Sequence, residues 1–258
     1  LYVRGQSADY DHWRQLGNAG WSFDDVLPYF RRAESQERGA DDFHGAEGPL
    51  AVSDMRAGHE LHDAFIQACQ EAGYKFNPDF NGAEQEGVGI YQLTVRGRRR
   101  ASTAVTYLRP AMKRPNLKVE VRALAQKIIF DGQRAIGLEY RQDGAVRRAR
   151  ARREVLLAGG SLQSPQLLQL SGVGPAALLR QFGIAVAHEL PGVGENLQDH
   201  LGCRVIYKVR KANTINEISR SWVRQGWAGF QYLTVGRGPL MMGAARIGRF
   251  ACTRRTSA

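Results

Sequence analysis

One stretch, Arg153–Gly174 (REVLLAGGSLQSPQLLQLSGVG), constrains the fold of this chain more than any other. It opens with a short apolar run, Val155–Ala158, and passes through a glycine pair into a leucine-rich segment. A buried strand, a glycine turn and a helix in this order are typical of a βα unit. Ser164 is a favourable N-cap, and Pro165 suits the first helical position because its missing N–H has no partner there. The backbone amides of such a turn can hold an anion or the diphosphate of a cofactor.

The first 110 residues favour helices separated by glycine-rich loops. Ser22–Asp25 is a capping box, and apolar residues recur every three or four positions after it and again after His59. Residues 34–50 and 74–101 are polar and rich in glycine, so we expect loops there, with a short β-like run at Gly89–Val95. The predicted helices are Ala8–Trp13, Val26–Ala33, His59–Ala72, with Leu61, Ala64, Phe65, Ala68 and Ala72 on its apolar face, and Thr103–Leu108, capped by Ser102 and limited by Pro110.

From Pro115 the pattern changes to strands. The dipeptides Asp131-Gly132 and Asp143-Gly144 lie between runs of β character, and Asp-Gly is a strong hairpin signal. Three or more strands therefore form an antiparallel meander that leads into the βα unit. The predicted strands are Leu117–Val121, Gln126–Phe130, Ala135–Tyr140 and Ala145–Ala149, with Ile184–Val186 and Val205–Val209 later; helices are expected at Pro175–Phe182 and Ser219–Leu233.

Length and composition set the broad class of protein. The chain has 258 residues, 43% of them hydrophobic and 24% charged, which suits one large domain or two small ones. No run approaches the ~20 apolar residues that span a bilayer, so we expect no integral membrane segment. The first residues are polar, which predicts no signal peptide. Three scattered cysteines favour a reduced, cytoplasmic protein. Because the chain starts at Leu1 in what reads as structure, we interpret it as a piece of a longer protein.

The formal net charge of +11 raises the alternative of a basic nucleic-acid-binding or interaction module. Arginines cluster at Arg96–Arg100, at Arg147–Arg153 and beyond Glu217. None of these clusters lies in a recognisable nucleic-acid-reading motif, and aromatic residues are not interleaved with them. We therefore expect no nucleic-acid partner, while the alternative stays open.

No local motif settles the chemistry. His59 and His62 lie one short turn apart, but they do not form the HExxH zinc motif and no third ligand is evident, so we predict no metal site. Gly159–Gln163 resembles a nucleophile elbow until Gln163, where glycine is required, which argues against a serine hydrolase. The glycine loops at Gly172–Pro175 and Gly192–Glu195 do not complete GxGxxG.

Taken together, the blocks resemble one family. The run Gly160–Gly174 (GSLQSPQLLQLSGVG) matches every specified position of the second signature of the glucose–methanol–choline oxidoreductases, flavoproteins that oxidise alcohols with FAD. The resemblance is nearest to the choline-dehydrogenase-like and aliphatic-alcohol-dehydrogenase branch. The other blocks follow in the family's order: Tyr2–Asp11, Asn18–Glu34, Phe43–Leu50, Arg99–Pro110, Asn116–Tyr140 and Gly192–His200.

The resemblance implies a combined α/β and α+β fold class. It would include part of an FAD/NAD(P)-binding, Rossmann-like domain with a β-meander crossover, followed by the start of an antiparallel-sheet substrate domain. Four segments are expected: FAD-domain residues 1–50 after a missing dinucleotide loop, a substrate-domain or lid segment 51–110, FAD-domain residues 111–200 with the meander and βα unit, and the start of the substrate domain at 201–258 with an atypical basic tail.

The same resemblance implies FAD as cofactor and a small alcohol as substrate. Ala125 matches a position whose backbone contacts the adenosine part of FAD, and Ala158 and Gly159 end a strand where open α/β sheets bind ligands. The family transfers a hydride to the flavin while a histidine takes the hydroxyl proton. None of the six histidines here matches that residue, so no catalytic residue is predicted. We expect the chain alone to be inactive, to bind FAD weakly or not at all, and to be cytoplasmic or peripheral to the inner membrane. Beyond Pro239 the sequence leaves the family pattern, as an out-of-frame tail would.

Overall fold

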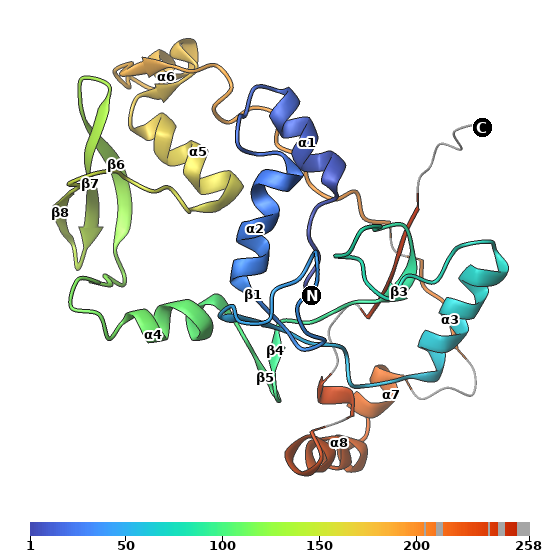
Figure 1. The fold of residues 1–258 in the computed structure, drawn as a ribbon. Helices are drawn as coiled ribbons and strands as arrows, with labels where there is room; N and C mark the ends of the chain where they lie inside the picture. The colour runs from blue at the N-terminus through green and yellow to red at the C-terminus, as the bar shows by residue number, and fades with distance from the viewer. Residues whose placement is uncertain (204, 210–213, 237, 242–245, 252–258) are drawn as a thin grey trace. The chain divides into compact units, whose positions relative to one another are not determined.

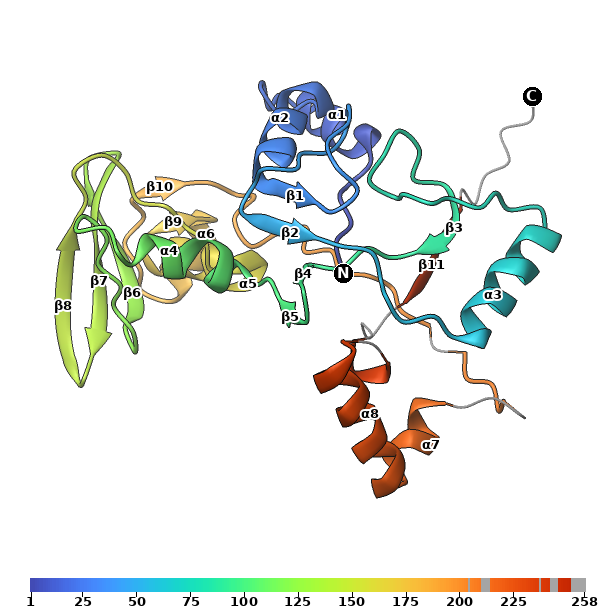
Figure 2. The same cartoon turned by 60° about the horizontal axis from the view of Figure 1, so that its bottom comes forward.

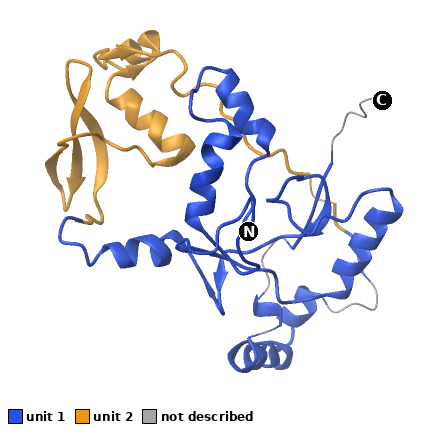
Figure 3. Cartoon of the chain, viewed as in Figure 1, with its two compact units in different colours: residues 1–117, 207–258 blue, residues 118–206 orange. Residues whose placement is uncertain are grey.

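The protein is described by a computed structural model that covers residues 1–203, 205–209, 214–236, 238–241 and 246–251. It divides into two compact units (Figure 3), one of residues 1–117 with 207–258 and one of residues 118–206. Within the described residues, no helix has the length and apolarity needed to cross a membrane. The four domain segments expected from the sequence remain a prediction.

The larger unit begins with two packed helices, α1 (Ser7–Gln15) and α2 (Phe23–Ala33). Ser22 and Asp25 form the predicted capping box at the start of α2, because Ser22 Oγ accepts from the Asp25 N–H and Asp25 Oδ2 accepts from the Ser22 N–H. The ring of Tyr10 lies 5.7 Å from that of Phe30, centroid to centroid, and joins the two helices. Both predicted helices are therefore confirmed.

Residues 34–50 contain sheet as well as the predicted loop. The strand β1 (Glu34–Gln36) pairs in parallel with β2 (Leu50–Val52), with Ser35 opposite Ala51. Each strand has three residues, too few for a visible alternation of apolar and polar side chains. The parallel partner also lies across a loop, so no hairpin signal marks the pair.

Two further pairs complete the sheets of this unit. The strand β3 (Gly87–Ile90) pairs antiparallel with β11 (Ile247–Phe250), and β4 (Val95–Arg96) forms a hairpin with β5 (Arg99–Arg100). Val88 on β3 is completely buried. Figures 1 and 2 both show β11, from near the end of the chain, lying beside β3. The short helices α7 (Ile215–Ser219) and η2 (Pro239–Met241) flank the longer α8 (Trp222–Thr234).

Part of the basic sequence has a structural role. Arg98, in the β4–β5 turn, donates from its guanidinium to the carbonyl oxygens of Tyr232, Leu233 and Thr234. These carbonyls end α8, where a positive charge interacts favourably with the helix dipole. At least one arginine of the Arg96–Arg100 cluster therefore stabilises the fold.

The helix α3 (Glu60–Glu71) confirms a predicted element but not its buried face. His59 caps it through a bond from the Leu61 N–H to His59 Nδ1. His62 and Cys69 are the buried residues, whereas Phe65, expected on the core side, is 47% exposed. The predicted face is wrong because the surrounding chain packs against a different side of the helix.

The prediction that Pro110 ends a helix is also wrong. A π-helical turn, η1 (Ala104–Leu108), continues directly into α4 (Arg109–Ala111). Pro110 lies at the start of α4, directly after the π-helical turn, and the backbone on either side of the junction keeps helical angles. The helical segment therefore continues through Pro110 to Ala111.

The smaller unit contains the predicted antiparallel meander of β6 (Leu124–Asp131), β7 (Arg134–Gln142) and β8 (Ala145–Arg150). Asp143 and Gly144 have φ of 51° and 81°, the positive values that a type I′ turn needs. The meander is followed by α5 (Gly160–Leu170), β9 (Val173–Gly174), α6 (Ala176–Gln181) and β10 (His188–Glu189), with β9 and β10 parallel. Helix α6 confirms the predicted Pro175–Phe182 helix, and α8 the predicted Ser219–Leu233 helix.

Three of the strands predicted outside the βα unit are absent from the described residues. Leu117–Val121, Ile184–Val186 and Val205–Val209 have no strand assignment. Each is a short apolar run, and such a run becomes a strand only where a neighbouring strand satisfies its backbone groups. Val205, Ile206 and Tyr207 are more than 70% exposed, which shows that nothing described covers them.

A buried charge network holds the larger unit together. Arg4 Nη2 donates to Glu34 Oε2 at 2.5 Å, and both side chains are 3% exposed or less. His44 Nδ1 lies 2.9 Å from Glu34 Oε2, and its Nε2 lies 2.7 Å from Asp79 Oδ2. Burial alone would lower the pKa of His44, but the hydrogen bonds to Asp79 and Glu34 outweigh it and raise that pKa to about 9. His44 is therefore charged at neutral pH and offsets the buried carboxylates.

This network makes the stability of the unit fall at alkaline pH. The His44 pKa is raised above its unfolded value of 6.5, so its contribution is complete below pH 6.5 and declines as pH rises through 9. The full contribution is about 3 kcal/mol. Urea midpoints measured from pH 6 to 10 should fall for the wild type and fall less for His44→Gln. Equal slopes for the two proteins would contradict the assignment.

Candidate cofactor site

The predicted cofactor residues line one cavity in the smaller unit, between the start of β6 and helix α5. These elements lie side by side in Figures 1 and 2. The cavity has a volume of about 380 Å³, and most of its walls are apolar. It is lined by Ala123, Leu124, Ala125, Leu138, Val155, Leu156, Leu157, Ala158, Gly159, Gln163, Ser164, Gln166, Leu167 and Leu170.

Ser171, just after α5, joins the two elements that border the cavity. Its hydroxyl donates to the Leu167 carbonyl and accepts from the Ile128 N–H at 2.8 Å. Ser171 and Ile128 are each 3% exposed. Because β6 is the edge strand of the meander, the Ile128 amide would otherwise lack a partner. One serine therefore joins the end of α5 to the middle of β6.

The rim of the cavity is the turn that starts α5. Gly159 is the N-cap, and Gly160 has φ of +86°, a value that glycine adopts without strain. Ser164 Oγ accepts from the Gly159 N–H at 3.0 Å. The predicted start of the helix at Ser164-Pro165 is therefore wrong by one turn. The Ser164 side chain caps the N-terminus from inside the helix, and Pro165 lies within the helix instead of at its first position.

The apolar run Val155–Ala158, predicted as a buried strand, is extended but has no strand assignment. Leu156 is 79% exposed. A parallel strand needs neighbours on its edges to satisfy its backbone, and no described strand pairs with this run. The βα unit is therefore present as a turn and a helix, without its strand.

The structure brings Ala125, Ala158 and Gly159 to the same cavity. Ala125 lies opposite Tyr140 in the β6–β7 ladder, next to a register shift at Gln126. The ladder is thus irregular at the point where β6 borders the cavity. A cavity with apolar walls, an edge-strand backbone and a glycine turn on its border can accept a planar heterocycle with polar edges. These features fit the adenosine part of FAD, and the cavity accommodates only a portion of so large a molecule.

Sequence reasoning missed the side chains that line the cavity from α5 and β7. Leu138, Gln163, Gln166 and Leu167 complete the walls. On α5, residues 163, 166, 167 and 170 follow the helical spacing of three and four, which places them on one face. A helix that starts at Gly160 places these four residues on one face, so the correct helix start would have predicted them from the sequence.

The structure also shows the surroundings of the candidate metal-binding, serine and histidine residues. Within the described residues, no group of three or more His, Cys, Asp or Glu side chains is arranged to hold a metal ion. Ser161 lines a second cavity with the Gly194–Gln198 loop, without a histidine among its lining residues. His200 is exposed, and Asp199 accepts from its backbone N–H.

Comparison with known proteins identifies related sequences. Residues 1–202 match the family described as GMC oxidoreductase. Mitochondrial choline dehydrogenase of Mus musculus is 50% identical over 201 residues, which are 78% of this chain and 34% of that protein. Oxygen-dependent choline dehydrogenase of Serratia proteamaculans is 48% identical over 242 residues, covering 92% of this chain and 43% of its own length. The chain thus spans less than half the length of these relatives.

Solved structures agree with the sequence match. An FAD-dependent oxidoreductase from Chaetomium thermophilum superposes with a TM-score of 0.85 at 26% identity, over 96% of this chain and 46% of that one. Pyridoxine 4-oxidase from Mesorbium loti gives a TM-score of 0.73 at 31% identity, over 77% of this chain and 40% of that one. The predicted fold class, part of a Rossmann-like domain with mixed α/β and α+β elements, is confirmed by these matches.

Proposed function

This chain belongs to the GMC oxidoreductase family, and from that membership we propose that it forms part of an FAD-dependent oxidoreductase acting on the CH–OH group of its donors. The observation that carries the proposal is the cavity between β6 and α5, where Ala125, Ala158 and Gly159 meet. FAD, when bound, accepts a hydride from the alcohol carbon. The residues of this chain bind and orient the cofactor's adenosine end.

The roles of the cavity residues follow from their chemistry. Ala125 offers backbone groups at the edge of β6, and its small side chain leaves room for a heterocycle. Leu138 and Leu167 supply apolar surfaces on either side. The Gly159 N–H is taken by Ser164 Oγ, so an anionic group of the cofactor would bind to the next amides of α5, which have no partner within the helix. Ser171 positions β6 against α5 through its bond to Ile128.

Substrate and location belong to the same proposal. The relatives named choline dehydrogenase favour a small alcohol of the choline type as substrate of the whole protein. We assign residues 1–50 and 111–200 to the flavin domain and residues 51–110 and 201–258 to the substrate side. We place the protein in the cytoplasm or at the periphery of the inner membrane. No residue of this chain is assigned as the catalytic base.

The proposal is tested by FAD binding to the purified chain. We expect FAD to raise the melting temperature of the chain with a saturable dependence on concentration, and riboflavin, which lacks the adenosine part, to leave it unchanged. The half-saturating concentration should be high, because the chain supplies only part of a flavin site. Ala125→Trp, which fills the cavity, should remove the FAD effect. Ala145→Trp, at the exposed start of β8, is the matched control and should retain it.

Two results would overturn the proposal. One is a saturable effect of riboflavin equal to that of FAD, because binding would then not depend on the adenosine part. The other is an FAD effect that survives Ala125→Trp while the variant keeps the wild-type far-UV circular dichroism spectrum, because binding would then occur outside this cavity.

A further inference from the structure

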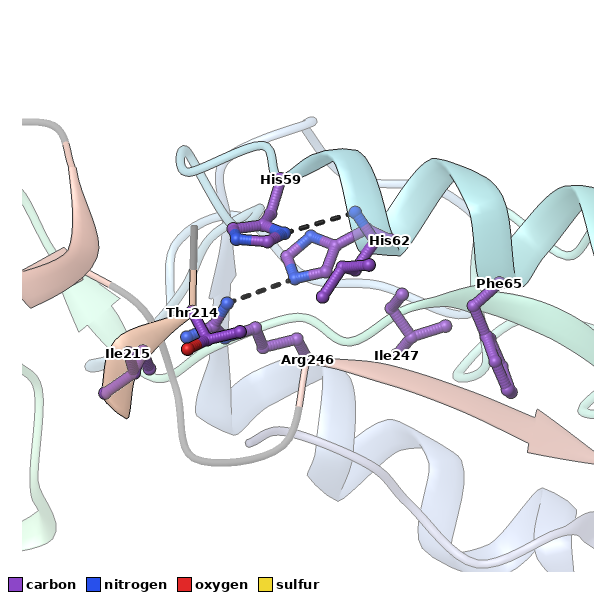
Figure 4. Close-up of a pocket in the computed structure, with 8 residues that line it drawn as sticks. His59, His62, Phe65, Thr214, Ile215, Arg246 and Ile247 are labelled. Atoms are coloured by element: carbon purple, nitrogen blue, oxygen red, sulfur yellow. Dashed lines mark hydrogen bonds between the residues drawn. The ribbon is translucent and has the colours of Figure 1, made fainter. Parts of the chain in front are cut away.

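A second cavity, in the larger unit, is not used by the proposed function. It lies where the start of α3 meets residues that precede α7 and β11, and Figure 4 shows it in close-up. Its volume is about 450 Å³, within the range of small-molecule sites. It is lined by His59, Leu61, His62, Phe65, Thr214, Ile215, Arg246 and Ile247.

His62 carries a buried donor that lacks an acceptor. The residue is only 5% exposed, and its Nε2 lies 3.4 Å from Nη1 of Arg246. Because a guanidinium can only donate, Nε2 accepts and the imidazole proton is on Nδ1. Within the described residues, Nδ1 is buried without a hydrogen-bond partner. A buried N–H left unpaired destabilises the protein, so an acceptor at this position would be bound favourably.

Arg246 carries a positive charge that lacks a carboxylate. Among the described residues, no Asp or Glu lies within ion-pair distance of its guanidinium, in contrast to Arg4, which is paired with Glu34. Burial lowers the pKa of Arg246, and burial followed by the nearby charge of Arg246 lowers that of His62. The cavity therefore holds one half-buried cation and one neutral imidazole, and this electrostatic environment attracts an anion.

Most of the remaining lining residues are apolar, and two of them are about half-exposed. Leu61, Phe65, Ile215 and Ile247 line the cavity beside the polar pair, and Phe65 and Ile215 are 47% and 51% exposed. In Figure 4, His62 lies between His59 and Arg246, and Phe65 lies on the far side of Ile247. The two histidines and Arg246 thus lie at one end of the cavity, and Phe65 lies at the other.

We propose that this cavity binds a small organic carboxylate with an apolar body. The planar fork of Arg246 matches the two oxygens of a carboxylate, and the Nδ1–H of His62 supplies a further donor. The hydrocarbon part lies against Leu61, Phe65 and Ile247. Inorganic phosphate fits less well, because its larger charge and additional oxygens need more donors than the apolar walls provide.

Titration calorimetry of the purified chain without FAD tests this proposal separately from the flavin site. Butyrate is the probe, and butylammonium and inorganic phosphate are the comparison ligands. We expect saturable butyrate binding, at least tenfold tighter than that of either comparison ligand. Arg246→Gln should weaken butyrate binding at least tenfold. Arg249→Gln, on the strand β11 that follows Arg246, should leave butyrate binding unchanged, because Arg249 faces Tyr74 outside the cavity.

A second measurement in the wild-type chain is independent of how the variants fold. Long-range ¹H–¹⁵N spectra should show His62 as the Nδ1–H tautomer, and butyrate should shift its Nδ1 resonance. The proposal is overturned by the absence of saturable butyrate binding, by equal binding of butylammonium or phosphate, by unchanged binding to a folded Arg246→Gln variant, or by a His62 resonance that does not respond.

Discussion

Replacing Glu34 by Gln should destabilise the larger unit by about 3–5 kcal/mol, the usual effect of removing one member of a buried ion pair. The Glu34 side chain is fully buried, and its carboxylate accepts from Arg4, His44, Gln36 and the Gly45 N–H. A glutamine turns an amide group toward some of these donors and leaves the charges of Arg4 and His44 in the interior. The urea midpoint should therefore fall steeply, with the slope of the transition unchanged.

Glu37→Gln is the matched control in the same unit. Glu37 pairs with Arg56 at 3.1 Å, but the two side chains are 31% and 52% exposed. An exposed pair of this kind contributes less than about 1 kcal/mol, because water solvates both charges when the pair is broken. If Glu34→Gln lowers stability no more than Glu37→Gln does, the buried network is not the organising feature of this unit.

The parts of the fold that were predictable rest on local signals. The meander was found because Asp143-Gly144 forces a tight turn between strands that are neighbours in sequence. Helix α2 was found because Ser22 and Asp25 satisfy its first amides within three residues. In each case the interactions that decide the structure join residues close together in the chain.

The parts of the fold that could not be predicted depend on contacts between residues far apart in the sequence. The pairing of β1 with β2 crosses a loop, and the pairing of β3 with β11 joins positions such as Val88 and Arg249. The Arg4–Glu34–His44 network likewise joins three separated segments, and no period or motif marks it in the sequence. Each of these contacts exists only after the chain has folded, so local propensity could not reveal it.

The candidate cofactor site was partly predictable for a different reason. Ala125 was chosen by resemblance to a family, and Ala158 and Gly159 were chosen because open α/β sheets bind ligands where their strands end; all three line one cavity. Ser171 was not chosen, although its bond to the Ile128 amide fixes β6 against α5. A serine after a helix also fits an ordinary helix end, so its role becomes visible only when β6 lies beside it. The role of these three residues in binding FAD stays a prediction, and the packing of Ser171 explains how β6 is held beside α5.

The second large effect is expected for Gly45→Ala, at about 3 kcal/mol or more, the upper end of the range for overpacked positions. A Cβ at Gly45 would lie 1.8 Å from the carbonyl oxygen of Arg31, in the last turn of α2. The obstacle is backbone, so no side-chain rotation relieves it, and the loop must move away from β1. That movement would break the bond from the Gln36 N–H to the Gly45 carbonyl, 2.8 Å long, and loosen the cover over Glu34.

Gly58→Ala separates this clash from the general effect of adding a methyl group to a glycine. A Cβ at Gly58 meets no atom within 4 Å, so the substitution should change stability by less than about 1 kcal/mol. Urea unfolding of both variants measures the difference directly. Equal midpoints for the two would mean that the loop does not pack against the end of α2. A large loss of stability in Gly45→Ala alone would mean that glycine is required at this position, because the end of α2 leaves no room for a side chain there.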